Sequence, residues 1–144
     1  WAALNLMKVL TAYAGGGWSD RAPRRIVVAV SWAAWALGFW LLCGAQSASG
    51  LWLVSLYVGA AAGLGEGAER ALTRDYASAE ETGTAFGWYY FLVGLASIPA
   101  GLAFGALWQF GSAALAFSFA GAIAALSALA ILGTVERREA SAGV

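Results

Sequence analysis

The sequence contains no histidine, and cysteine, lysine and methionine each occur only once. Without histidine, and with Cys43 as the single cysteine, a His/Cys metal cluster, a Ser-His-Asp triad and an internal disulfide are excluded. There is also no phosphate-binding loop, and no basic patch interleaved with aromatic residues. The sequence therefore predicts no catalytic residue, no metal site, no cofactor and no nucleic-acid partner.

Charged residues are scarce, at 11% of the chain, whereas hydrophobic residues make up 61% and the mean hydropathy is +0.71. Soluble domains carry about 25% charged and about 45–50% apolar residues. The 19 glycines also point to a membrane protein, because glycine is commoner in membrane helices than in soluble ones. The composition indicates an α-helical membrane protein, with the lipid bilayer as its main partner.

Five segments approach the roughly 20 apolar residues that a membrane-spanning helix needs. They are residues 1–17, 26–45, 50–72, 84–107 and 113–133. The predicted fold class is all-α, a polytopic bundle of about five transmembrane helices over 1–135, with a cytoplasmic tail at 136–144. Residues 1–17 have no charged leader and no cleavage site, so we interpret them as a truncated span with sequence missing upstream.

The charges lie in only some of the connections. Charged residues fall between the first two spans, after the third and after the fifth, whereas residues 45–50 and 108–112 carry none. An alternating path places every charged connection on one side of the membrane. By the positive-inside rule that side is cytoplasmic, which predicts a cytoplasmic C-terminus in an inner (plasma) membrane.

Small residues at four-residue spacing predict close helix packing in the third and fourth spans. The rows are Gly59, Gly63 and Gly67, and Gly101 with Gly105. Pro99 lies inside the fourth span, where it is either a static kink or a hinge. The second and fifth spans carry no charge, so we expect them to be outer, lipid-facing helices. Trp32 and Trp35 in the second span are interpreted as lipid-facing or packing residues rather than as a ligand cage.

Lys8 lies roughly 13 Å inside the cytoplasmic end of the first span, at 1.5 Å per residue, where a charge by default marks a function. A functional residue and a structural ion pair are equally compatible with this position. Glu66 is the deepest carboxylate, and it precedes Arg70 by one helical turn. Glu66 either pairs with Lys8, which is slightly favoured, or faces a cavity and carries a proton. Asn5 and Tyr57 are further cavity-lining candidates.

The first charged connection reads Gly16-Gly17-Trp18-Ser19-Asp20-Arg21-Ala22-Pro23-Arg24-Arg25. It resembles the G-x-L-[AS]-D-R-x-G-[RK]-[RK] signature of the major facilitator superfamily, with Trp18 and Pro23 as departures. Four spans follow it, so the resemblance implies the second copy of the motif and places the chain at helices eight to twelve. The stretch from Gly65 through Asp75 to Tyr89 also resembles a connection in that superfamily.

The resemblance implies a cytoplasmic gate held by a charge network. Its members would be Gly16, Asp20, Arg21, Arg24, Arg25, Glu69 and Asp75. In that network Asp20 and Arg24 would pair with Glu69 or Asp75. For Arg25, a solvated loop position is the preferred interpretation.

The resemblance implies secondary active transport of an unknown small molecule by alternating access, through proton-coupled efflux of the antiporter type. The cavity would lie between this half and a missing N-terminal half. Two other classes stay open: a non-transporting scaffold or accessory subunit, and a membrane-embedded enzyme. An enzyme would need a Ser-Lys or carboxylate arrangement, and no serine stands beside Lys8 in an obvious partner position. The chain alone is expected to be inactive.

Overall fold

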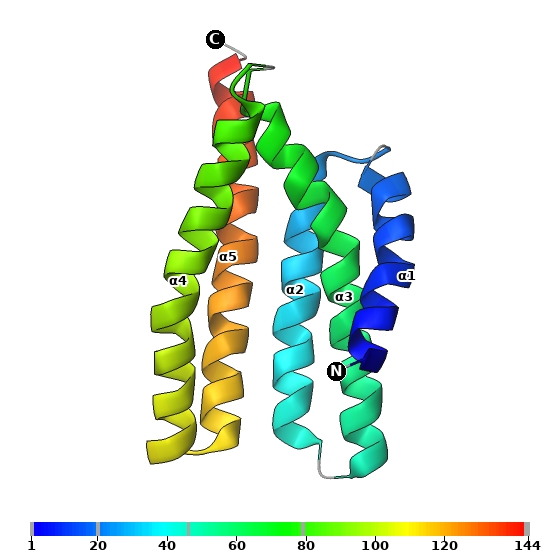
Figure 1. Cartoon of the computed structure of the whole chain (residues 1–144), viewed down its shortest axis with the longest axis vertical. Helices are drawn as coiled ribbons and strands as arrows, with labels where there is room; N and C mark the ends of the chain where they lie inside the picture. The colour runs from blue at the N-terminus through cyan, green and yellow to red at the C-terminus, as the bar shows by residue number, and fades with distance from the viewer. Residues whose placement is uncertain (1, 20, 46, 79, 143–144) are drawn as a thin grey trace.

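The computed structural model describes residues 2–19, 21–45, 47–78 and 80–142, with side chains up to residue 133. It contains five α-helices (Figure 1): α1 (Ala2–Ser19), α2 (Arg24–Gly44), α3 (Ala48–Asp75), α4 (Thr82–Phe110) and α5 (Ala113–Ala142). No strand occurs among the described residues. The predicted all-α bundle is confirmed, and α5 continues nine residues past the expected end of its span, from residue 133 to Ala142.

The helices run up and down in chain order, so the connections fall at two ends of the bundle (Figure 1). The connections after α1 and after α3 lie at the same end as the C-terminus, and these are the charged ones. The uncharged connections after α2 and after α4 lie at the other end. We call these the charged end and the uncharged end of the bundle.

Within the described residues, four helices are long and apolar enough to cross a membrane: α2, α3, α4 and residues Ala113–Gly133 of α5. The 18-residue α1 is not among them. It nevertheless packs along α3, so the structure joins it to the bundle of spans. The chain is therefore a multi-pass membrane protein.

The expectation that the second span is an outer helix is wrong. Helix α2 packs against both α3 and α5 and lies between them (Figure 1). Val27, Val28 and Ala36 on α2 are buried, and the Ser31 hydroxyl donates a 2.7 Å hydrogen bond to the carbonyl of Ala61 on α3. Lipid tails are as apolar as a helix neighbour, so the absence of charge does not distinguish the two environments.

The predicted packing of the first glycine row is confirmed. A Cβ atom at Gly59 would overlap the carbonyl of Leu4, and one at Gly63 would overlap the carbonyl of Lys8. The backbones of α1 and α3 therefore approach as closely as glycine allows. Gly101 and Gly105 differ, because nothing in the described chain lies within 4 Å of a Cβ built on either.

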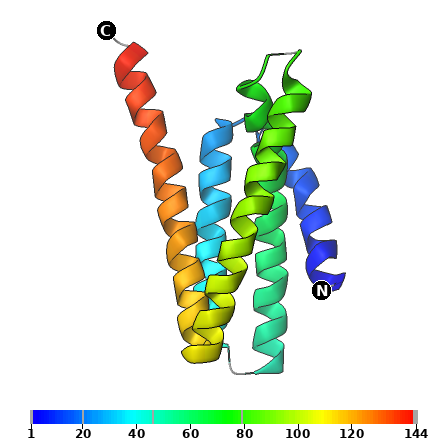
Figure 2. The same ribbon diagram turned by 60° about the vertical axis from the view of Figure 1, so that its left-hand side comes forward.

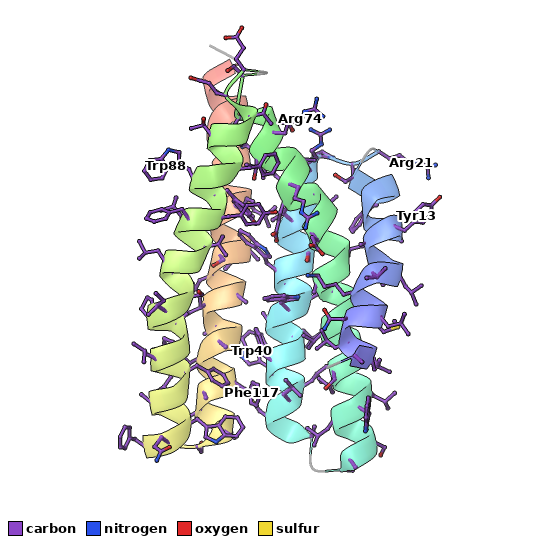
Figure 3. The ribbon with its side chains drawn as sticks, viewed as in Figure 1. Tyr13, Arg21, Trp40, Arg74, Trp88 and Phe117 are labelled. Atoms are coloured by element: carbon purple, nitrogen blue, oxygen red, sulfur yellow. The ribbon has the colours of Figure 1, made fainter. Side chains whose placement is uncertain are left out.

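Helices α4 and α5 meet at the uncharged end and diverge toward the charged end (Figure 2). Trp40 on α2 packs over Gly121 of α5, and the Phe39 ring stacks on Phe117 with centroids 6.4 Å apart (Figure 3). None of the α4 residues is buried, and Trp88 points away from the bundle (Figure 3). The divergence leaves two hollows between α4 and the rest of the bundle.

Candidate functional site

The first hollow is a cavity of about 510 Å³ between α1, α2, α3 and α4, which we call the polar cavity. It is lined by Lys8, Ser31, Trp32, Trp35, Ala62, Glu66, Glu69, Arg70, Tyr89, Tyr90 and Val93. Two acids, two cations and four aromatic rings thus share one space among membrane helices. Ionisable residues in such a position are costly and mark substrate or ion pathways.

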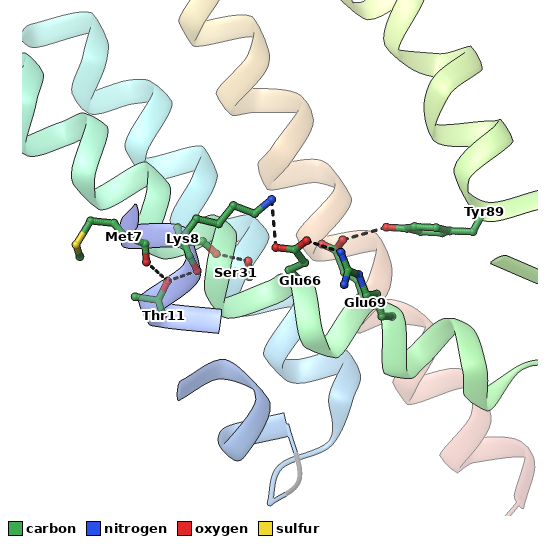
Figure 4. Close-up of polar contacts among 9 residues, drawn as sticks. Met7, Lys8, Thr11, Ser31, Glu66, Glu69 and Tyr89 are labelled. Atoms are coloured by element: carbon green, nitrogen blue, oxygen red, sulfur yellow. Dashed lines mark hydrogen bonds and ion pairs between the residues drawn. The ribbon is translucent and has the colours of Figure 1, made fainter. Parts of the chain in front are cut away.

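At one side of the polar cavity, Lys8 and Arg70 hold the same carboxylate. The Lys8 ammonium lies 3.1 Å from Glu66 Oε2, and the Arg70 guanidinium donates to Glu66 Oε1 at 2.6 Å. Figure 4 shows Lys8 reaching Glu66 from α1. Of the two roles considered for Glu66, the structure shows the ion pair with Lys8. The three side chains together carry one net positive charge, and we call them the positive group.

At the other side, Glu69 accepts hydrogen bonds from two neutral donors. The Trp32 indole on α2 donates to Glu69 Oε1 at 2.7 Å. The Tyr89 hydroxyl on α4 donates to Glu69 Oε2 at 3.1 Å, as Figure 4 shows. Glu69 follows Glu66 by three residues on α3. Residues at this spacing lie on the same side of a helix, so the two carboxylates are neighbours. A single carboxylate thus connects three helices.

Among the gate candidates, the structure places Arg21, Arg24, Arg25 and Asp75 at the charged end. Arg24 at the start of α2 forms an ion pair with Asp75 at the end of α3, and the Arg25 guanidinium lies 5.5 Å from the centre of the Tyr76 ring. Arg21 is exposed and points away from the bundle (Figure 3). Asp20 lies outside the described residues.

Three further candidates lie apart from both groups of charges. Asn5 on α1 and Tyr57 on α3 are half-buried and are not among the residues lining the polar cavity, and Tyr57 lies beside Gly38 of α2. Pro99 lies in the middle of α4.

Two gate candidates lie away from the Arg24–Asp75 pair. Gly16 lies in the last turns of α1, where its backbone comes near Gly67. The gate acid Glu69 lies in the polar cavity instead of with Asp75.

The sequence reasoning missed the aromatic residues of the polar cavity. Trp32 hydrogen-bonds Glu69 and lines the cavity with Trp35. Trp32 also packs on the core and Trp35 on Phe39, so the packing role that was one of the two expected for this pair is confirmed. Tyr89 and Tyr90 received no role. A signal was present, because Trp32 and Trp35 lie inside a span and away from the interfaces where membrane tryptophans gather.

The second hollow is an apolar cavity of about 470 Å³ between α2, α4 and α5. Trp32 and Trp35 border it as well as the polar cavity. The remainder of its wall comes from Phe39, Ala100, Phe104, Phe119, Ala120, Ile123, Ala124 and Ser127. A charged compartment and an apolar compartment therefore lie on either side of two tryptophans.

Comparison with known proteins decides the family. The family model of the Major Facilitator Superfamily matches residues 2–143, which is nearly the whole chain. The chain belongs to the major facilitator superfamily. The resemblance seen in the loop motif is thereby confirmed, and the chain is a membrane transporter of that superfamily. Searches of curated proteins and of solved structures gave no match.

Proposed function

We propose that this major facilitator chain forms the C-terminal half of a proton-coupled efflux transporter that moves a small molecule by alternating access. An N-terminal half would complete the cavity, as expected for a superfamily built from two repeats around a central site. The membrane would be the plasma membrane, with the charged end of the bundle and the C-terminus in the cytoplasm.

The observation that carries this proposal is the polar cavity itself. Its four charged side chains, Lys8, Glu66, Glu69 and Arg70, lie together in a bundle whose other helices, α2 to α5, are long and apolar enough to span a bilayer. A structural scaffold has no need for such a cluster, because each charge is costly at that depth. A volume of about 510 Å³ lies within the range of small-molecule sites.

Glu69 supports the proton coupling better than Glu66. Glu66 is engaged in ion pairs with two cations, whereas the described partners of Glu69 are a tyrosine hydroxyl and an indole. We therefore assign the exchange of a proton to Glu69 and a structural role to the Lys8–Glu66 pair.

The Arg24–Asp75 pair supports a gate at the charged end. It joins the start of α2 to the end of α3, and the polar cavity lies between the same two helices deeper in the bundle. An ion pair that forms in only one state biases the equilibrium toward that state. We assign Asp20 to the same network, where its charge would add to this bias. The variant Asp20→Asn tests the assignment: normal membrane expression with unchanged transport would show that Asp20 is no part of the gate.

The test is flux in proteoliposomes that contain this chain together with the N-terminal half. Vesicles are given a mixture of isotope-labelled amino acids, sugars, nucleosides and organic ions, with and without an imposed pH gradient, and their contents are read by mass spectrometry. The proposal expects at least one compound to move with the gradient and to stop when the gradient is collapsed. A properly folded protein that moves none of them would favour a scaffold or accessory role.

A further inference from the structure

We propose that the charged end of the bundle contains a specific site for the phosphate of an anionic phospholipid. The site lies where the start of α2, the end of α3 and the start of α4 meet, at the surface of the membrane. The lipid would bind there as a partner of the protein and not as its transported substrate, so the inference does not depend on the proposed transport.

The site is a pocket of about 970 Å³, which we call the charged-end pocket. It is lined by Arg24, Arg70, Ala71, Arg74, Asp75, Ala77, Thr82 and Phe86. Figure 3 shows Arg74 at this end of the bundle. The volume lies within the range of small-molecule sites, so the pocket has room for a headgroup.

Positive charge dominates the charged-end pocket. Of the residues that line it, three are arginines and only Asp75 is acidic, which leaves two net positive charges. Asp75 forms its ion pair with Arg24, and Arg70 pairs with Glu66, which is not among the lining residues. Arg74 is exposed, and its guanidinium has no partner among the side chains that the structure describes. An anion that enters the pocket therefore relieves the repulsion between the arginines and gives Arg74 a partner.

Phosphate suits the groups around this pocket. Guanidinium groups form paired hydrogen bonds with phosphate oxygens. Thr82, the first residue of α4, lines the pocket, and the first turn of α4 holds no acidic residue. The N–H groups and the dipole at the start of a helix attract phosphate. Glu81, just before α4, does not line the pocket, and its carboxylate accepts a 3.1 Å hydrogen bond from the Ser78 hydroxyl.

The surroundings of the pocket favour a lipid over a soluble phosphate. Phe86 is the aromatic member of the lining, and its ring stacks on Tyr90 one turn further along α4, with centroids 6.4 Å apart. Helix α4 is long and apolar enough to span a bilayer, and none of its residues is buried. Trp88 is 60% exposed and points away from the bundle (Figure 3), as tryptophans at the level of the headgroups do.

A phosphate bound by the arginines therefore lies next to an exposed apolar helix surface, along which the acyl chains of a phospholipid can run. A soluble phosphate compound would use the arginines and leave this surface unused. Basic pockets between membrane helices bind anionic headgroups in this way.

The test measures the binding of two phospholipids that differ only in their headgroup. Native mass spectrometry is applied to this chain together with the N-terminal half, in detergent, during titration with dioleoylphosphatidylglycerol or dioleoylphosphatidylcholine. Each lipid has one phosphate, but the choline cation cancels its charge. We expect the first phosphatidylglycerol to bind at least about fivefold more tightly than phosphatidylcholine, because arginines at the membrane surface attract anionic lipid. Equal affinities for the two lipids overturn the proposal.

Arg74→Gln and Arg21→Gln form a matched pair, because each removes one exposed arginine from the charged end and Arg21 does not line the pocket (Figure 3). Arg74→Gln should weaken phosphatidylglycerol about fivefold and leave phosphatidylcholine binding and the thermal unfolding midpoint unchanged. Arg21→Gln should weaken phosphatidylglycerol by less than about twofold. Equal losses in the two variants would show a general attraction by surface charge and contradict a specific pocket.

Glycerol 3-phosphate distinguishes a lipid from a soluble phosphate. It carries a phosphate on glycerol without acyl chains, so a large excess should not displace phosphatidylglycerol. Displacement that is lost in Arg74→Gln would identify a site for a soluble phosphate compound and overturn the lipid assignment. Lipid binding as expected without flux of any compound would contradict the proposed function alone. Gradient-driven flux with equal binding of the two lipids would contradict this inference alone.

Discussion

Tyr89 on α4 donates a 3.1 Å hydrogen bond to Glu69 on α3, and both residues line the polar cavity. The other oxygen of Glu69 accepts from Trp32 on α2 at 2.7 Å. Helix α4 has no buried residue and packs loosely on α3, so this bond adds a specific link between the two helices. A change in the charge or occupancy of Glu69 would weaken this link.

Removing the Tyr89 hydroxyl tests this link. Tyr89→Phe should lower the free energy of unfolding by about 1 kcal/mol, the net value of one hydrogen bond, and more if the carboxylate oxygen is left without a donor. Tyr90→Phe is the matched control, since Tyr90 lines the same cavity and has no hydrogen bond to Glu69. Unfolding in mixed micelles, followed by tryptophan fluorescence, provides the measurement. Equal effects of the two variants would show that the Tyr89 bond restrains nothing.

The Lys8–Glu66 pair should be measurable as a coupling between α1 and α3. Both side chains are about a third exposed, at 35% and 30%, so we expect a coupling free energy of about 1 kcal/mol in a double-mutant cycle of Lys8→Met and Glu66→Gln. Pairing Lys8→Met with Glu80→Gln is the control, because Glu80 lies in the exposed connection after α3. A cycle that closes with no coupling would leave Lys8 free for a direct role in transport.

Gly63 and Gly101 form a matched pair for the packing of small residues. Gly63→Ala should destabilise the protein by about 1–3 kcal/mol, because the added methyl overlaps the carbonyl of Lys8. Gly101→Ala should be neutral or stabilising by up to about 1 kcal/mol, since its site is open and alanine is the better helix former. Thermal unfolding in detergent distinguishes them. A larger loss at Gly101 would mean that another surface of the assembled transporter packs there.

Reversing the Arg24–Asp75 pair tests the gate. Each single change, Arg24→Asp or Asp75→Arg, should slow transport by placing like charges together, and the double reversal should recover part of the rate. Stability should change by less than about 1 kcal/mol, because the pair is exposed. Flux in proteoliposomes and unfolding are measured on the same preparations. Full transport in both single variants would show that this pair is no gate.

Much of the fold follows from the sequence because hydropathy and charge are local properties. The five helices, their alternation and the grouping of charged connections at one end depend on segment length and loop composition alone. The glycine row of α3 was also readable, since Gly59, Gly63 and Gly67 share one helix face. The position of α2 was not, because a face that packs on α5 and a face in lipid use the same apolar residues.

The site divides in the same way. The depth of Lys8 in its span indicated that it could reach Glu66 on another helix, as the structure shows. The four-residue spacing of Glu66 and Arg70 indicated a pair on one helix face, which also forms. The partners of Glu69 come from two other helices, 37 and 20 residues away in the chain, and no local pattern shows which helices meet. The loop motif directed attention to the charged end, although a separate group of charged residues lines the polar cavity within the bundle.

Access to the polar cavity tests the central claim most directly, without knowledge of the substrate. Ala62 lines that cavity and is neither charged nor hydrogen-bonded through its side chain, so Ala62→Cys in a Cys43→Ser background gives one reporter thiol. Gly101→Cys on the open face of α4 is the control for thiols that face lipid. A membrane-impermeant thiol reagent is applied from each side of sealed vesicles, with and without a pH gradient. Alternating access predicts labelling of residue 62 from both sides, in proportions that the gradient changes; labelling from neither side, or from one side under all conditions, would contradict it.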